Sequence, residues 1–262
     1  MHDQSLLDPS HAIALRAVVA MSAASLGGLI GIAWNRVSHK VLCGMVSLAA
    51  GALLGVTVLH IIPETFEILG AWPSLVSLVA GYLLFAAIGK YIYFICPACA
   101  ASASEHETGY LRLGILLMIS MSIHSTVDGL AISAGSRTFS VVGIMILLAV
   151  SYHKVPEGLA LVSVARLSGY GRAKAIFVTL LIELTTVLGA FIGLLLFFEV
   201  QQTLLAVILG FVAGSFLYTV GFALIKEMFA HEKISIFIYL GLGFASMIVF
   251  SKVVSSLGMH VH

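Results

Sequence analysis

SIHSTVDGLAIS (residues 122–133) and SYHKVPEGLALV (residues 151–162) repeat one pattern inside two long apolar runs. In each stretch a histidine is followed four positions later by a carboxylate, and then by Gly-Leu-Ala. The runs, at about 110–134 and 140–165, are each long enough to cross a bilayer, which takes roughly 20 apolar residues. The sequence therefore predicts two neighbouring membrane helices, each with a histidine and an acid near its midpoint.

Similar apolar runs recur along the whole chain. Of its 262 residues, 60% are hydrophobic and 10% are charged, which is too little polar surface for a soluble domain. We predict an all-α integral membrane protein, a single domain over residues 1–262 with eight transmembrane helices. No basic segment precedes an apolar stretch at the start, so we expect no cleaved signal peptide. The predicted spans are about 11–34, 41–66, 74–95, 110–134, 140–165, 173–197, 203–225 and 233–256.

The distribution of Lys and Arg predicts the orientation, because cytoplasmic ends carry the excess of positive charge. With the N-terminus outside, only Arg16, Arg137 and Lys252 lie at outer ends. Both termini are then extracytoplasmic, and we expect the plasma (inner) membrane. The cytoplasmic ends hold Arg36, Lys40, Lys90, Arg112, Arg166, Arg172, Lys174, Lys226 and Lys233.

Two classes of partner find no support in the sequence. There is no phosphate-binding loop of the G-x-x-x-x-G-K-[ST] type, so we expect no nucleotide. The net charge of +1 and the lack of a basic run argue against nucleic acid.

The two histidine–acid pairs predict one buried site. Residues four apart share a helix face, so His124 pairs with Asp128 and His153 pairs with Glu157. Both pairs lie near the midplane of antiparallel neighbours and can meet. Glu183 lies in the middle of the sixth span, at the same depth. Burying such charges costs on the order of 10 kcal/mol, which argues against a purely structural ion-pair cluster.

Imidazole and carboxylate ligands suit Zn²⁺, and also Fe²⁺, Mn²⁺ or Cd²⁺. The three acids and Lys154 leave a charge of about −2, which one divalent cation or protonation would cancel. Pro156 removes a helical hydrogen bond to the carbonyl of Tyr152, and the opened turn could present an oxygen to an ion. On antiparallel helices the near-repeat resembles the inverted repeats of secondary transporters.

Two further groups extend the hypothesis from a site to a path. His60 and Glu64, four apart near the outer end of the second span and flanking Pro63, are predicted to form a cation entrance; the alternative is a solvated helix end. Cys96 and Cys99, with His106 nearby, could bind metal on the cytoplasmic side; the alternative is a neutral loop, because a lone C-x-x-C is not specific.

HSTVDGLAIS, HKVPEGLAL and the LHIIPE of the second span together resemble the ZIP (Zrt/Irt-like) family of divalent-metal transporters. The resemblance implies eight helices with both ends outside, uptake of Zn²⁺ or related ions into the cytoplasm, and a homodimer. It also implies that His124, Asp128, His153 and Glu157 are transport-site ligands, to which Glu183 contributes.

The chain departs from this family at two positions of the site. Many members have Asn directly after the first histidine and an acid or amide after the second, which helps to build a two-metal centre. Here these positions hold Ser125 and Lys154, which we expect to substitute for the second metal site.

A secondary transporter is the main hypothesis, without a catalytic cofactor. The alternative is a membrane-embedded zinc hydrolase, because zinc with an open position activates water. A site at mid-depth with polar residues toward both faces favours the transporter. A metal-sensing receptor is a third possibility, but the chain has no cytoplasmic effector domain.

Overall fold

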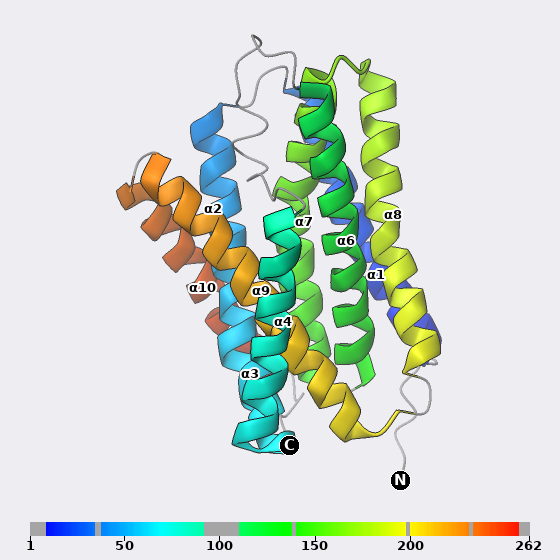
Figure 1. The fold of residues 1–262 in the computed structure, drawn as a ribbon, viewed down its shortest axis with the longest axis vertical. Helices are drawn as coiled ribbons and strands as arrows, with labels where there is room; N and C mark the ends of the chain where they lie inside the picture. The colour runs from blue at the N-terminus through cyan, green and yellow to red at the C-terminus, as the bar shows by residue number, and fades with distance from the viewer. Residues whose placement is uncertain are drawn as a thin grey trace.

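The structure, a computed structural model, describes residues 9–34, 38–91, 110–137, 140–197, 200–230 and 233–256. All regular structure in these ranges is helical, and the helices form an elongated bundle (Figure 1). The helices are α1 (Pro9–Ala33), α2 (His39–Val56), η1 (Thr57–Ile61), α3 (Ile62–Leu69), α4 (Ala71–Tyr91), α6 (Tyr110–Arg137), α7 (Ser140–Leu167), α8 (Arg172–Leu196), α9 (Gln202–Ala230) and α10 (Lys233–Ser256).

The predicted all-helical class is confirmed, and most helix bounds lie within a few residues of the predicted spans. The seventh span differs most at its end, which lies at Ala230 rather than at residue 225. The second span continues beyond residue 66 to Leu69. It consists of α2, η1 and α3 in direct succession. Residues 92–95 of the third predicted span lie outside the described ranges.

The η1 segment is a π-helical turn, which the sequence did not predict. Its defining contact is the backbone N–H of Ile62, which donates to the carbonyl of Thr57, five residues back. Pro63 follows directly and has no N–H to donate. The widened turn thus lies directly ahead of this proline, and π-turns of this kind occur frequently at functional sites.

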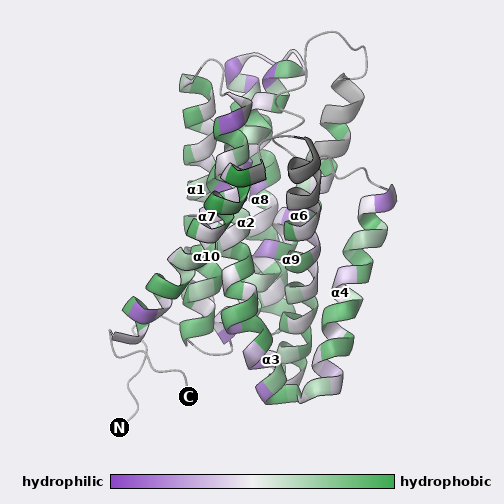
Figure 2. Ribbon diagram, turned by 90° about the vertical axis from the view of Figure 1, so that its left-hand side faces the viewer, coloured by the Kyte–Doolittle hydropathy of each residue, from purple (hydrophilic) through white to green (hydrophobic). Residues whose placement is uncertain are grey.

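Seven helical segments are long and apolar enough to cross a membrane within the described residues. The helix α6 is not among these seven, although its 28 residues are enough to cross a bilayer. Hydrophobic residues cover most of the helix length, and hydrophilic residues gather mainly at helix ends (Figure 2). The chain is therefore an integral membrane protein by the length and composition of its helices.

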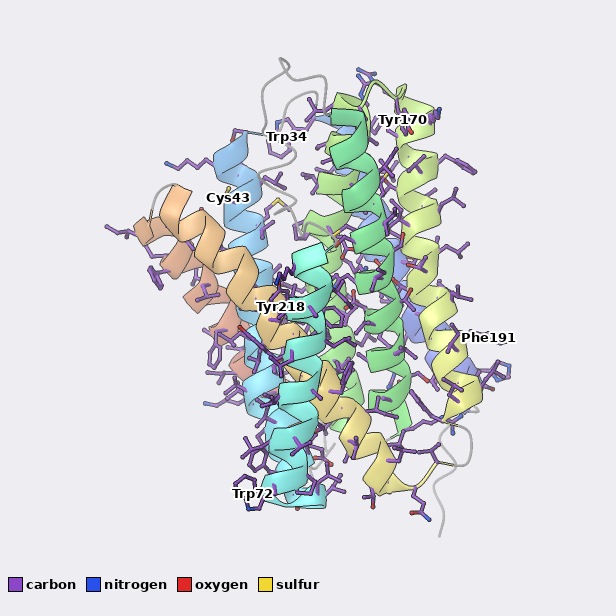
Figure 3. All side chains as sticks on the ribbon, viewed as in Figure 1. Trp34, Cys43, Trp72, Tyr170, Phe191 and Tyr218 are labelled. Atoms are coloured by element: carbon purple, nitrogen blue, oxygen red, sulfur yellow. The ribbon has the colours of Figure 1, made fainter. Side chains whose placement is uncertain are left out.

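Tryptophan side chains mark the two ends of the bundle. Trp34 lies at the upper end in Figure 3, as does Tyr170, whereas Trp72 lies at the lower end. These are the only two tryptophans of the chain, and they are 55% and 79% exposed. Tryptophan is enriched where a membrane meets water, so its position at both ends of the bundle agrees with a membrane-spanning unit.

Glycines bring the helices that form the centre of the bundle close together. A Cβ on Gly129 of α6 would collide with the carbonyl oxygen of Thr186 in α8, and one on Gly189 of α8 would collide with that of Thr126. Such reciprocal contacts let two backbones approach closely, a common device in membranes. The same arrangement joins three other helix pairs: Gly27 with Gly158 (α1 and α7), Gly51 with Gly243 (α2 and α10), and Gly81 with Gly214 (α4 and α9).

Candidate metal centre

The two histidine–acid pairs come together inside the bundle. His124 and Asp128 lie on α6, His153 and Glu157 lie on α7, and all of these side chains are buried. One ligand atom from each residue can be chosen so that all lie within 4.8 Å of one another. Each pair thus contributes half of one buried group, and the spacing predicted that the two pairs would meet.

The distances in this group fit a metal ion. His153 Nε2 lies 3.1 Å from Asp128 Oδ2 and 3.9 Å from Glu157 Oε2. His124 Nε2 lies 3.8 Å from Asp128 Oδ2. Ligands at about 2.0–2.2 Å from a tetrahedral zinc lie about 3.3–3.6 Å apart, so these atoms need only small adjustments to surround an ion.

The unused atoms of the group also favour a cation. Asp128 Oδ1 and Glu157 Oε2 have no hydrogen-bond partner among the described residues, although both are buried. Buried carboxylate oxygens are costly when unpaired, and a bound cation would remove this cost. The ring of His153 is held from behind, because Nδ1 lies 3.0 Å from the carbonyl oxygen of Ala149, which leaves Nε2 to face the site.

Lys154 is the most unusual residue of the site. It is fully buried on α7, and its ammonium donates to Ser125 Oγ at 2.7 Å and to Glu157 Oε1 at 3.0 Å. The same Nζ lies 3.2 Å from Asp128 Oδ2 and 3.1 Å from Glu183 Oε2. Lys154 therefore links carboxylates from α6, α7 and α8.

Glu183 is adjacent to the metal-type group without being one of its members. It is fully buried on α8, and Lys154 is the charged residue it contacts. Its position at the depth of the other acids agrees with the sequence, but its immediate partner is the ammonium. Ser125 completes the connection, because its hydroxyl donates to Glu157 Oε1 at 3.0 Å.

The glycine after each acid explains why the repeated pattern continues past the carboxylate. Gly129 follows Asp128 and faces the backbone of α8, whereas Gly158 follows Glu157 and faces the carbonyl of Ala24 in α1. Each helix can then direct its acid into the buried group while the adjacent face packs closely against another helix. The close packing at these two glycines was not predicted, although their place in the repeat was a signal for it.

Comparisons with known proteins agree with this geometry. The family model described as "ZIP Zinc transporter" matches residues 96–251, more than half of the chain, and this range contains the whole buried group. The chain belongs to the ZIP zinc transporter family. The description of the family names transport rather than an enzymatic reaction, which agrees with the preference for a transporter over a membrane hydrolase.

Two individual ZIP relatives are similar over a shorter range. The chain is 26% identical to the zinc transporter ZupT of Corynebacterium glutamicum and 28% identical to that of Corynebacterium efficiens, in each case over 124 residues. These matches cover 42% of this chain, and 47% and 46% of the respective relatives. The matched part is therefore a little under half of each relative.

The predicted entrance residues lie on the α2–η1–α3 segment, outside the range of the family match. Glu64 is buried rather than solvated, and His60 is partly buried with its Nε2 atom enclosed and without a hydrogen-bond partner. Neither belongs to the buried metal-type group. Cys96, Cys99 and His106, the predicted cytoplasmic metal ligands, lie outside the described residues.

Pro156 lies inside α7, which continues as an α-helix on both sides of it. The predicted opened turn is thus accommodated without ending the helix. The carbonyl oxygen of Ala149, one turn before His153, lies 3.0 Å from His153 Nδ1. The carbonyl of Tyr152 as an oxygen presented to an ion stays a prediction.

Proposed function

We propose that this ZIP-family chain is a secondary transporter that carries Zn²⁺ into the cytoplasm. Its substrate range would include related divalent ions such as Fe²⁺, Mn²⁺ or Cd²⁺. The ion would bind His124, Asp128, His153 and Glu157, with Glu183 contributing charge from α8. The observation that carries the proposal is this buried mixed nitrogen and oxygen set, in which two carboxylate oxygens have no hydrogen-bond partner within the described part of the chain.

The chemistry of these residues suits a transported ion. Imidazole nitrogens and carboxylate oxygens replace the water molecules that the ion loses when it leaves solution, and they are ligands that zinc prefers. Three carboxylates and one ammonium at this depth leave a charge of about −2, so one divalent ion makes the centre neutral. A neutral loaded site lowers the electrostatic cost of an ion at the middle of a bilayer.

We infer the orientation of the chain in the membrane from the distribution of its basic residues. Arg166 donates to the carbonyl of Tyr170 at 3.3 Å, and Lys174 Nζ lies 4.3 Å from the centre of the Tyr170 ring, at the end of the bundle that also holds Trp34. Cytoplasmic ends carry such positive charge, so this end would face the cytoplasm. Both termini would then be extracytoplasmic, in the plasma (inner) membrane.

His60 and Glu64 would form the entrance on the opposite side. The enclosed, unpartnered Nε2 of His60 and the buried carboxylate of Glu64 support this role, because together they offer a cation two ligand atoms outside the main centre. Four further features remain predictions. They are the single domain over residues 1–262, the inverted relation of α6 and α7, the homodimer, and metal binding by Cys96, Cys99 and His106.

Uptake into sealed vesicles tests the proposal directly. Purified protein is reconstituted into liposomes that contain a zinc-sensitive dye, and Zn²⁺ is added outside. We expect dye signal well above that of protein-free liposomes, and competition by Fe²⁺, Mn²⁺ or Cd²⁺ would define the range. A signal equal to that of empty liposomes, from protein that is inserted and folded, would overturn the proposed function.

A further inference from the structure

Lys154 has the surroundings of a bound cation. Its Nζ atom lies between 2.7 and 3.2 Å from four oxygens, which come from α6, α7 and α8. The side chain is fully buried, so water does not compete for these contacts. The four oxygens are Ser125 Oγ, Asp128 Oδ2, Glu157 Oε1 and Glu183 Oε2.

We propose that these oxygens form a second cation subsite, which the tethered ammonium of Lys154 fills permanently. The centre would then bind one divalent ion, and removing the ammonium would open the subsite to a second one. This inference rests on the proposed function, because it takes the neighbouring histidine–carboxylate group as the metal position.

The division of the carboxylate oxygens supports two adjacent cation positions. Glu157 directs Oε1 to Lys154, whereas its Oε2 has no hydrogen-bond partner and lies 3.9 Å from His153 Nε2. Asp128 places one oxygen between the two positions, because Oδ2 lies 3.2 Å from Lys154 Nζ and 3.1 Å from His153 Nε2. Its Oδ1 has no hydrogen-bond partner among the described residues. Each acid can thus bridge the ammonium and a metal ion, as carboxylates bridge the ions of two-metal sites.

The contacts of Glu183 indicate that the Lys154 ammonium occupies the place of a cation. Both of its oxygens lack a hydrogen bond of good geometry among the described residues, and the 3.1 Å contact with Nζ is its charge partner. Without Lys154, the three acids would surround one divalent ion with an excess negative charge of about −1 and an empty oxygen cage. A second cation is what such a cage would bind.

Metal counting on purified protein tests the inference without measuring transport. The native chain, Lys154→Ala and Lys154→Met are stripped with a chelator, dialysed against saturating Zn²⁺ and analysed for bound metal. We expect about one ion per native chain and about two per chain in either variant. Lys252→Ala, which removes an exposed lysine, is the matched control and should keep the native count.

Chemical rescue adds a readout that a structural role would not move. Propylammonium restores the atoms that Lys154→Ala lacks, so an excess of it should return the count in that variant toward one. With Mn²⁺ in place of Zn²⁺, two ions about 3.5–4 Å apart would also give a spin-coupled EPR signal in the variants alone.

The possible failures can be told apart. Two ions in the native protein, or one ion in both folded variants, would overturn the inference and leave the proposed function intact. No bound metal in the native protein would overturn the proposed function and the inference with it. If Lys154→Ala does not fold, Lys154→Met decides the question by the same count.

Discussion

Nε2 of His153 lies 3.1 Å from Oδ2 of Asp128, across the interface between α7 and α6. The opposite ring nitrogen faces the carbonyl oxygen of Ala149, one turn back on the same helix. The ring therefore has its orientation set by its own helix and its reactive edge directed at the neighbouring one. The candidate site is therefore shared between α6 and α7. Each of its residues can be replaced separately to test its role.

We expect His153→Ala and Glu157→Ala each to reduce zinc uptake to near background. Loss of a residue that hydrogen-bonds a metal ligand lowers metal affinity or activity by about 10–100-fold, and loss of the ligand itself lowers it further. Uptake is measured in proteoliposomes with equal amounts of inserted protein. His11→Ala and Glu67→Ala remove an exposed histidine and an exposed acid and should transport normally. Near-native uptake by both site variants would refute the assignment of these ligands.

Glu183→Gln should weaken metal binding less than Asp128→Asn does. Glu183 is charge partner to Lys154, so the amide removes about one negative charge at short range but no member of the buried ligand group. We expect an affinity loss of about tenfold, against a loss of about a hundredfold or more for Asp128→Asn. Zinc titration with a competing fluorescent chelator measures both. An equal loss in the two variants would make Glu183 a direct ligand.

The double change of His60→Ala with Glu64→Ala should raise the KM for uptake while the maximal rate changes little. An entrance concentrates ions without holding them at the transport site, so a higher external concentration compensates for its loss. Initial uptake rates over a range of Zn²⁺ concentrations separate the two parameters. A lower maximal rate at unchanged KM would remove these residues from the entrance role.

Gly129→Ala should destabilise the bundle by about 1–3 kcal/mol, because the added methyl group meets the backbone of α8 and forces the helices apart. Thermal unfolding of detergent-solubilised protein measures this effect. Gly241→Ala is the control, since a Cβ at that position meets nothing within 4 Å. Equal melting temperatures for the two variants would show that the α6–α8 contact tolerates a side chain.

Single cysteines test the orientation. In a cysteine-free background, a membrane-impermeant maleimide added to intact cells should label Ala71→Cys, which is next to Trp72 at the lower end in Figure 3. Gly171→Cys, next to Tyr170 at the upper end, should react only after the membrane is permeabilised. Both positions are exposed. The reverse pattern would place both termini in the cytoplasm.

Local patterns predicted much of this fold. Apolar runs gave the helices because a bilayer fixes their length, and the four-residue spacing of His124 with Asp128 fixed one shared face. The ammonium of Lys154 was correctly expected beside Glu157, three positions away on the same helix. These features depend on distances along a single helix.

Features that depend on contacts between helices were harder to predict. The hydroxyl of Ser125 joins Lys154 to Glu157 across two helices, and Gly129 determines how near α8 can lie. The π-turn at Thr57–Ile61 was also missed, because a proline shows where a helical hydrogen bond is lost but not how the backbone adjusts. Such details are set by packing partners that are distant in sequence.

That π-turn changes the direction in which the side chains of the second span point. A π-turn holds one residue more than an α-helical turn, so every side chain after Ile61 is rotated by about 100° relative to an uninterrupted helix. The stripe of Gly51 and Gly55 can therefore face α10, while the face with Glu64 and Thr65 is turned toward other neighbours. Deleting Val58 would restore a continuous α-helical wheel and misdirect the acid, although the span would keep its length and hydrophobicity almost unchanged.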